Sequence, residues 1–185
     1  MIRRRVSSRS HPHDDVARLE RSVASVSHAP LLTTIDFTVN GERYAVAVEP
    51  RCTLADALRE KCGLTGTNLG CEHGVCGTCT VLVEGEPVRS CLMFAVQLEG
   101  KSIRTVEGLA KDGRLHELQR AFTEHHALQC GYCTPGFLML AVSYLEKNGS
   151  VDEHEIRDLV ASNLCRCTGY QNIVQAISAA ASRLR

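Results

Sequence analysis

The sequence predicts an α+β protein in two successive parts, a β-sheet with one helix followed by an all-α bundle. Apolar and polar residues alternate with the period of a strand through residues 33–49, and strand signals return over residues 80–108. After about residue 109 these signals stop and every longer segment has helical spacing. Eight of the ten cysteines form two separate groups, one in each half. We therefore expect two small domains, each built around its own cysteines.

The first half begins with a predicted hairpin. Residues 33–39 alternate as a half-buried strand does, and residues 42–49 resume the alternation. Asn40-Gly41 between them is the strongest short hairpin signal. Thr53 then provides a helix cap, and residues 54–61 place apolar side chains on one helical face.

Further strands are predicted after the first cysteine motif. Residues 80–85 and 86–100 are interpreted as a second hairpin, and residues 102–108 as a closing strand. In this interpretation Cys91 lies on a strand. Two strands, a helix, a loop and more strands together indicate a sheet covered by one helix.

The second half contains four segments with helical spacing. Thr134-Pro135 predicts a cap with proline at the first helical position, and Asn148-Gly149 a helix end. Short helices with short connections indicate an antiparallel bundle. We place the boundary between the halves at residues 108–113. The predicted helices cover residues 116–128, 135–149, 151–164 and 170–185.

Composition excludes some functions. Among the 185 residues, Lys plus Arg and Asp plus Glu number 21 each, which gives no support for a nucleic-acid partner. No apolar run is long enough to span a membrane. Residues 1–30 carry arginines without the apolar segment of a signal peptide, so we expect a disordered basic arm on a cytoplasmic protein. Because cytosolic thiols stay reduced, clustered cysteines there indicate metal ligands.

The cysteines of the first half have a specific spacing. Cys71, Cys76 and Cys79 follow the pattern C-x4-C-x2-C, and Cys91 comes after eleven intervening residues. This is the plant-type spacing for one [2Fe–2S] cluster. Glycines at positions 70, 74 and 77 let the loop adopt positive φ and bring backbone N–H groups to the sulfurs. A structural zinc site is the alternative, but zinc sites usually use two similar cysteine pairs.

The cysteines of the second half are less specific by themselves. Cys130-Gly-Tyr-Cys133 and Cys165-Arg-Cys167 are compatible with zinc, a redox dithiol or a cluster. A redox dithiol is expected in a βαβ context, and this half has no strand signal. Each pair precedes a predicted helix, whose N-terminus favours an anionic group. Beside the first motif, a second [2Fe–2S] cluster is the favoured interpretation.

The remaining cysteines have no such pattern. Cys52 and Cys62 flank the first helix without ligand-like neighbours, so we expect ordinary packed thiols. His73, within the first ligand loop, is expected to be a surface residue.

Taken together, "GCEHGVCGTCTV" with Cys91, "LQCGYCTPG" and "NLCRCTGYQNIVQAI" resemble the small iron–sulfur subunit of the molybdenum hydroxylases. This is the xanthine oxidase family, including its three-subunit bacterial members. The resemblance covers about residues 31–184. It implies a β-grasp, plant-ferredoxin-like domain over residues 31–108 and a helical-bundle domain over residues 109–185, each with one [2Fe–2S] cluster.

The resemblance also implies a role. In this family a large subunit holds a molybdenum–pterin cofactor that hydroxylates the substrate, and a medium subunit holds FAD, in complexes expected to be dimers of heterotrimers. The Cys130/Cys133/Cys165/Cys167 cluster would accept electrons first, and the Cys71/Cys76/Cys79/Cys91 cluster would pass them to FAD. Gln129 and Cys167 would approach the pterin.

The chain itself has no G-x-G-x-x-G motif, phosphate loop or acid–base constellation, so we expect no substrate-converting site on it. The rival hypotheses are a stand-alone iron–sulfur redox sensor and a structural zinc module.

Overall fold

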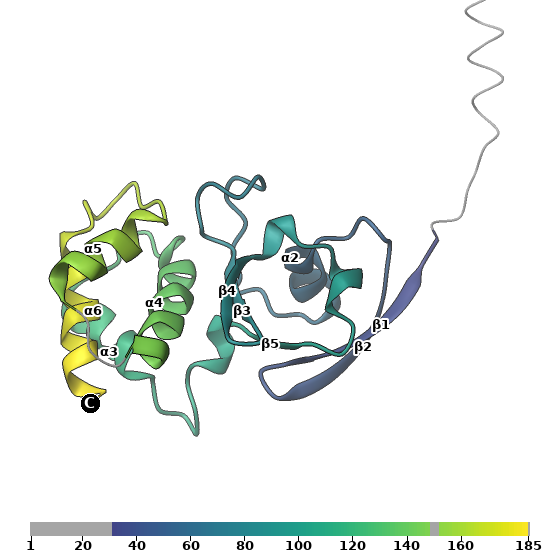
Figure 1. Ribbon diagram of the computed structural model, residues 1–185, viewed down its shortest axis with the longest axis horizontal. Helices are drawn as coiled ribbons and strands as arrows, with labels where there is room; N and C mark the ends of the chain where they lie inside the picture. The colour runs from purple at the N-terminus through teal and green to yellow at the C-terminus, as the bar shows by residue number, and fades with distance from the viewer. Residues whose placement is uncertain (1–30, 149–151, 185) are drawn as a thin grey trace, which may run out of the picture. The chain divides into compact units, whose positions relative to one another are not determined.

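A five-stranded mixed sheet forms the first half of the chain in a computed structural model, which describes residues 31–148 and 152–184 (Figure 1). The strand order is β2-β1-β5-β3-β4, in which β1 and β5 are parallel and the other neighbours antiparallel. The expected arm over residues 1–30 lies outside the described residues. The strands are β1 (Thr33–Val39), β2 (Glu42–Val48), β3 (Thr80–Val83), β4 (Glu86–Arg89) and β5 (Ser102–Arg104).

The first hairpin and the first helix are confirmed. Asn40 and Gly41 both have positive φ, 54° and 90°, as a tight hairpin turn requires. The helix begins as α2 (Leu54–Asp56) and continues as the π-helix η1 (Ala57–Lys61). Thr53 caps it, since its Oγ1 accepts a hydrogen bond of 3.1 Å from the Asp56 N–H.

The long strand expected over residues 86–100 is wrong beyond Arg89. Ser90–Leu92 and Ala95–Leu98 form two 3₁₀ helices, η2 and η3, so Cys91 lies on a 3₁₀ turn and not on a strand. The Ser90 N–H and hydroxyl still donate to the Cys79 carbonyl, in the register of the β3–β4 pairing. Beyond it, the Leu54 N–H donates to the Met93 carbonyl and the Ala95 N–H to the Cys52 carbonyl, so this segment bonds to the start of α2 and not to β3. Strand β5 is likewise shorter than expected and is followed by the 3₁₀ helix η4 (Val106–Gly108).

Four helices form the second half, as predicted, with shorter bounds. Helix α4 begins one residue early, so Thr134 is its first residue and not its cap, and the expected stop at Gly149 lies outside the described residues. Among the residues that the structure describes, no helix is long and apolar enough to cross a membrane. The helices are α3 (Glu117–Glu124), α4 (Thr134–Asn148), α5 (Glu153–Ala161) and α6 (Gln171–Arg183).

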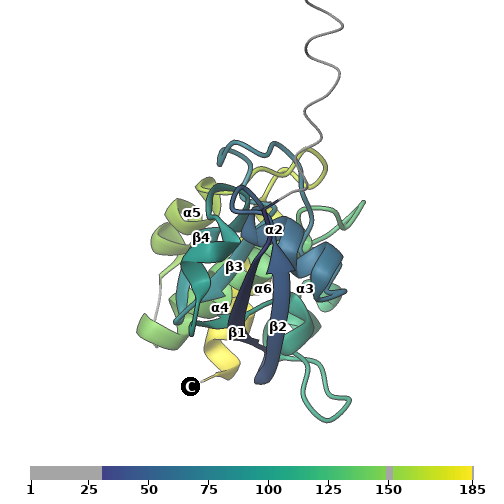
Figure 2. The same cartoon turned by 90° about the vertical axis from the view of Figure 1, so that its right-hand side faces the viewer.

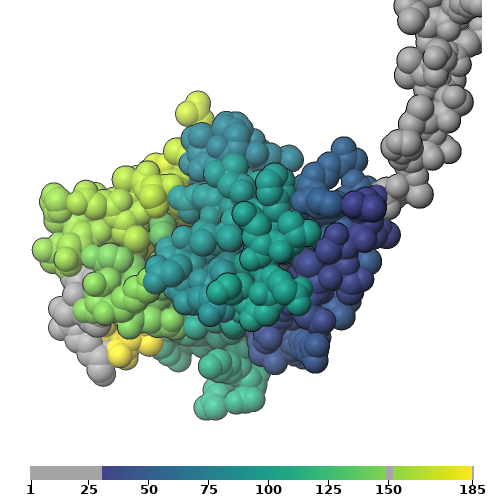
Figure 3. Space-filling view, turned by 45° about the vertical axis from the view of Figure 1, so that its right-hand side comes forward, coloured from purple at the N-terminus to yellow at the C-terminus, as the bar shows by residue number. Residues whose placement is uncertain are grey.

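Helix α4 packs against the β3–β4 hairpin and joins the two halves (Figures 1 and 2). Each half has its own hydrophobic core, but Leu82 of β3 belongs to the core of the helices. The Ser143 hydroxyl on α4 donates to the Gly85 carbonyl over 3.0 Å. In the space-filling view the green helical residues lie directly against the teal strand residues (Figure 3). The boundary placed at residues 108–113 stays a prediction.

The backbones of the two halves approach each other closely at Gly136, in the first turn of α4. A Cβ at this position would lie 2.4 Å from the Gly77 carbonyl oxygen and 2.9 Å from that of Thr78. Real Cβ atoms do not tolerate such distances, and backbone atoms cannot rotate away. Only glycine therefore lets α4 rest on the backbone of the first cysteine loop.

Replacing Gly136 with alanine should reverse the usual effect of this substitution. In an unobstructed helix, Gly→Ala stabilises by about 1 kcal/mol. Here the added methyl group must push α4 from the loop, and overpacking of this kind costs about 1–3 kcal/mol. We expect Gly136→Ala to lower the thermal melting temperature of the cluster-loaded chain. An unchanged or higher melting temperature would contradict the close packing.

Candidate metal centres

The first four predicted ligands lie on one loop and one neighbouring turn. Cys71, Cys76 and Cys79 come from the loop between η1 and β3, and Cys91 comes from η2. The Cys71 sulfur accepts a hydrogen bond from the Cys76 N–H, and Cys91 lies beside Cys79, so the thiols are neighbours in two pairs. Each iron of a binuclear cluster takes two thiolates, so this pairwise arrangement fits a [2Fe–2S] group.

Backbone N–H groups surround the Cys71 sulfur. The Cys76 N–H donates to it over 3.3 Å, and the N–H groups of His73 and Val75 add to the effect. These donors lower the pKa of the Cys71 thiol to about 6, because they stabilise the thiolate. The loop can turn its N–H groups inward because Gly74 and Gly77 have the expected positive φ, whereas Gly70 does not. The site therefore stabilises negative charge on sulfur.

The pKa of the Cys91 thiol is shifted in the opposite direction to that of Cys71. Burial, followed by the hydrogen bond with Cys79, raises the pKa of its thiol to about 11. A metal must displace the proton of such a ligand, since the thiolate is the coordinating form.

The second four predicted ligands also meet in pairs. The Sγ atoms of Cys130 and Cys167 lie 3.6 Å apart, and Cys133 is hydrogen-bonded to Cys165. Burial and then this hydrogen bond raise the pKa of Cys133 to about 12. For Cys165 burial raises the pKa, but donors led by the Thr168 hydroxyl, 3.1 Å from its sulfur, lower it overall.

Helix positions and exposure distinguish the members of this second set. Cys133 directly precedes α4, and the Cys165–Cys167 segment precedes α6, as predicted. Cys133 and Cys165 are half-buried, while Cys130 and Cys167 are exposed. Gln129, predicted to approach a partner's pterin, is exposed beside them.

Both donor sets therefore suit the same type of group. Four soft thiolates at one site favour zinc or iron–sulfur clusters. Over residues 31–148 and 152–184, no three His, Cys, Asp or Glu side chains are arranged around a single metal ion. The two-by-two pairing fits two irons, each bound by two thiolates.

A direct hydrogen bond connects the two ligand sets. The Leu164 N–H donates to the Cys76 carbonyl over 2.9 Å, and Leu164 is covalently next to Cys165. The Tyr132 hydroxyl also donates to the Leu69 carbonyl, and the Asn68 side-chain amide to the Tyr132 carbonyl. Sequence reasoning missed these contacts, because backbone groups carry the main one and leave no signal in residue identity.

The other cysteines and His73 behave as expected. Cys52 and Cys62 are half-buried and pack against the core of the sheet. Burial raises the pKa of the Cys62 thiol to about 11, which keeps it neutral. The His73 ring is exposed and contacts the Cys71 carbonyl, not a sulfur.

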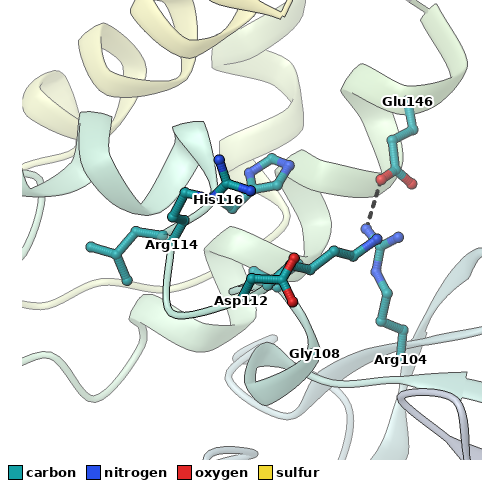
Figure 4. A pocket seen from close by; sticks show the side chains of 9 residues that line it. Arg104, Gly108, Asp112, Arg114, His116 and Glu146 are labelled. Carbon is teal, nitrogen blue, oxygen red and sulfur yellow. Dashed lines mark hydrogen bonds and ion pairs between the residues drawn. The ribbon is translucent and has the colours of Figure 1, made fainter.

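A surface pocket of about 380 Å³ lies away from these centres (Figure 4). One side holds the ion pair of Arg104 and Glu146, whose Nη2 and Oε1 atoms are 2.8 Å apart. None of the eight predicted cysteine ligands lines it. The cysteine chemistry is therefore separate from this pocket.

Comparison with known proteins gives two family matches. Residues 37–110 match the 2Fe-2S iron-sulfur cluster binding domain, and residues 105–178 match the [2Fe-2S] binding domain. Each match contains one set of four cysteines.

Individual relatives agree with these matches. The chain is 58% identical to the caffeine dehydrogenase subunit gamma of Pseudomonas sp. (strain CBB1), over 77% of this chain and 87% of that one. It is 59% identical to the nicotine 6-hydroxylase small subunit of Paenarthrobacter nicotinovorans, over 77% and 86%. A crystal structure of quinoline 2-oxidoreductase from Pseudomonas putida 86 superposes with a TM-score of 0.81 at 54% identity, over 83% of this chain and 96% of that chain. The chain therefore belongs to the family of small iron–sulfur subunits of the molybdenum hydroxylases, with two [2Fe–2S] domains that serve electron transfer in a multi-subunit oxidoreductase.

Proposed function

We propose that this chain is a two-step electron relay, in which the helical half receives electrons and the sheet half passes them on. The hydrogen bond from the Leu164 N–H to the Cys76 carbonyl carries this proposal. When bound, each [2Fe–2S] group supplies one-electron redox chemistry. The ligands that we assign are Cys71, Cys76, Cys79 and Cys91 for the first cluster and Cys130, Cys133, Cys165 and Cys167 for the second.

The chain's own residues stabilise charge at both sites. At Cys71 this is done by backbone N–H groups, and at Cys165 by the Thr168 hydroxyl. The N-terminus of α4, directly after Cys133, adds a partial positive charge. Such donors favour thiolate over thiol and an anionic group over a neutral one.

Exposure supports the direction of the relay. Cys130, Cys167 and Gln129 are exposed together, so a partner subunit with a molybdenum–pterin group can reach this end. At the other centre, the side chains of Val75 and Leu92 are apolar and 58% and 59% exposed. Exposed apolar residues of this kind favour a protein contact, here with a subunit that carries FAD.

The assembly and its location follow from the same proposal. We infer a large, a medium and this small subunit, paired as a dimer of heterotrimers. All ten cysteines are free thiols, which is compatible with a cytoplasmic location.

Removing one ligand from each set should remove one cluster at a time. The native protein should contain about four irons and four labile sulfides and give two low-temperature EPR signals after dithionite reduction. Cys76→Ala should abolish one signal and Cys133→Ala the other, each leaving about two irons. Cys62→Ala is the matched control, since this half-buried thiol binds no metal in our assignment, and it should keep both signals.

Other outcomes would support the rival functions. A colourless protein with stoichiometric zinc and no labile sulfide would identify a structural zinc module. Two clusters that exchange no electrons with each other in the purified complex would contradict the relay and favour a redox sensor.

The hydrogen bond between the ligand sets can be removed selectively. Leu164→Pro eliminates the N–H donor, whereas Leu164→Ala keeps it and removes only an exposed side chain. We expect Leu164→Pro to slow electron exchange between the clusters after flash photoreduction, with both EPR signals retained, and Leu164→Ala to exchange at the native rate. Equal rates in the two variants would exclude this path.

A further inference from the structure

We propose that Arg89 and Asn163 are positioning residues. They hold the two sets of cysteine ligands at a fixed spacing and favour reduction of the cluster at residues 71–91. This inference rests on the relay proposed above. Neither residue is one of the assigned ligands, and both lie where the segment 162–164 meets the first cysteine loop. We call this contact the latch: Arg89, Gly77 and residues 162–164.

Three consecutive residues of one segment make the latch. Arg89 Nη2 donates to the Ser162 carbonyl over 2.7 Å. The Asn163 side chain lies against Gly77, so closely that a Cβ on Gly77 would be 1.9 Å from Asn163 Oδ1. Leu164 then donates its N–H to the Cys76 carbonyl over 2.9 Å. The hydrogen bond that couples the ligand sets is thus the last of three adjacent contacts.

Arg89 holds the opposite side of the latch as well. Its Nη1 donates to the Thr80 hydroxyl, and that hydroxyl donates to the Gly77 carbonyl over 2.6 Å. One guanidinium therefore connects the helical segment, through Thr80, to the peptide between Gly77 and Thr78. Hydrogen bonds from a charged donor are stronger than neutral ones, and the planar guanidinium can serve two acceptors at fixed angles.

Asn163 provides a second and independent observation. It is 1% exposed, yet neither atom of its amide has a hydrogen-bond partner within the part of the chain that the structure describes. Leaving a buried polar group unsatisfied destabilises a fold, and leucine would fill a similar volume without this cost. Packing therefore does not explain an amide here. Its place against Gly77, between Cys76 and Cys79, puts its dipole next to the first ligand loop.

The positive charge of Arg89 favours reduction of the cluster at residues 71–91. A reduced cluster with four thiolates carries more negative charge than an oxidised one. The guanidinium of Arg89, two residues from Cys91 and bonded to the loop through Thr80, stabilises that added charge. The latch therefore fixes the spacing of the two ligand sets and also favours reduction of the one at residues 71–91.

The test compares four variants in the purified complex, by redox titration of both EPR signals and by electron exchange after flash photoreduction. Arg89→Met should shift the potential of the residue 71–91 cluster to a more negative value. Asn163→Leu should leave the protein fully loaded with iron. Both should slow exchange about tenfold, since displacements of about 1 Å in positioned groups cost up to roughly a hundredfold in enzyme rates. Arg43→Met, an equal loss of charge at an exposed site on β2, is the control and should change neither quantity.

Arg89→Lys separates charge from geometry. It keeps the positive charge but not the planar fork, so it should retain the potential and still slow exchange. It also decides the outcome if Arg89→Met fails to bind iron. Native exchange rates in both Arg89→Lys and Asn163→Leu would overturn the latch, while two signals and rapid exchange in the native protein would leave the relay intact. Absence of exchange in the native protein would instead refute the relay itself.

Discussion

The contact of the backbone at residues 76–78 with the helical half is the constraint on which the structure depends. Gly136 approaches this backbone from α4, and the Asn163 side chain and the Leu164 N–H approach it from the segment before α6. A side chain at Gly136 or at Gly77 would collide with the other half of the chain. Because backbone atoms make the contacts at Gly136 and Leu164, these two contacts cannot relax through rotamer changes. Because protein interiors are close-packed, a displacement of one half at this contact is passed on to the other half.

Each cysteine set combines adaptable and rigid supports. Cys71 and Cys76 come from an irregular loop whose N–H groups converge on sulfur, while Cys91 is held on a turn by hydrogen bonds from Ser90 to Cys79. In the second set, Cys133 is anchored at the start of α4. A loop can wrap around a compact inorganic group, and a rigid element fixes that group relative to the fold. The combination explains why the thiols already lie in pairs.

Much of this could be predicted from the sequence, because the signals were local. Asn40-Gly41 predicted the hairpin, and periodicity predicted the four helices. The resemblance of the cysteine motifs implied the family that the comparisons confirmed. The strand expected at Cys91 was wrong because the chain after Ser90 bonds to residues 52–54 and not to β3, and no local pattern encodes these partners. The bond from Leu164 to Cys76 was unpredictable for the same reason, since any residue but proline can donate it. The ligand roles of the eight cysteines stay a prediction.

The polarity of the contact between the halves distinguishes it from an ordinary domain interface. An interface selected only for stability would bury apolar side chains, as Leu82 does in the helical core. At the latch, by contrast, a guanidinium, a hydroxyl and an amide without a hydrogen-bond partner among the described residues surround the backbone between Cys76 and Cys79. Burying such groups costs free energy that apolar packing would not. The two halves therefore use apolar packing along α4 to stay together, and polar contacts near the cysteines to set the charge and spacing that electron transfer requires.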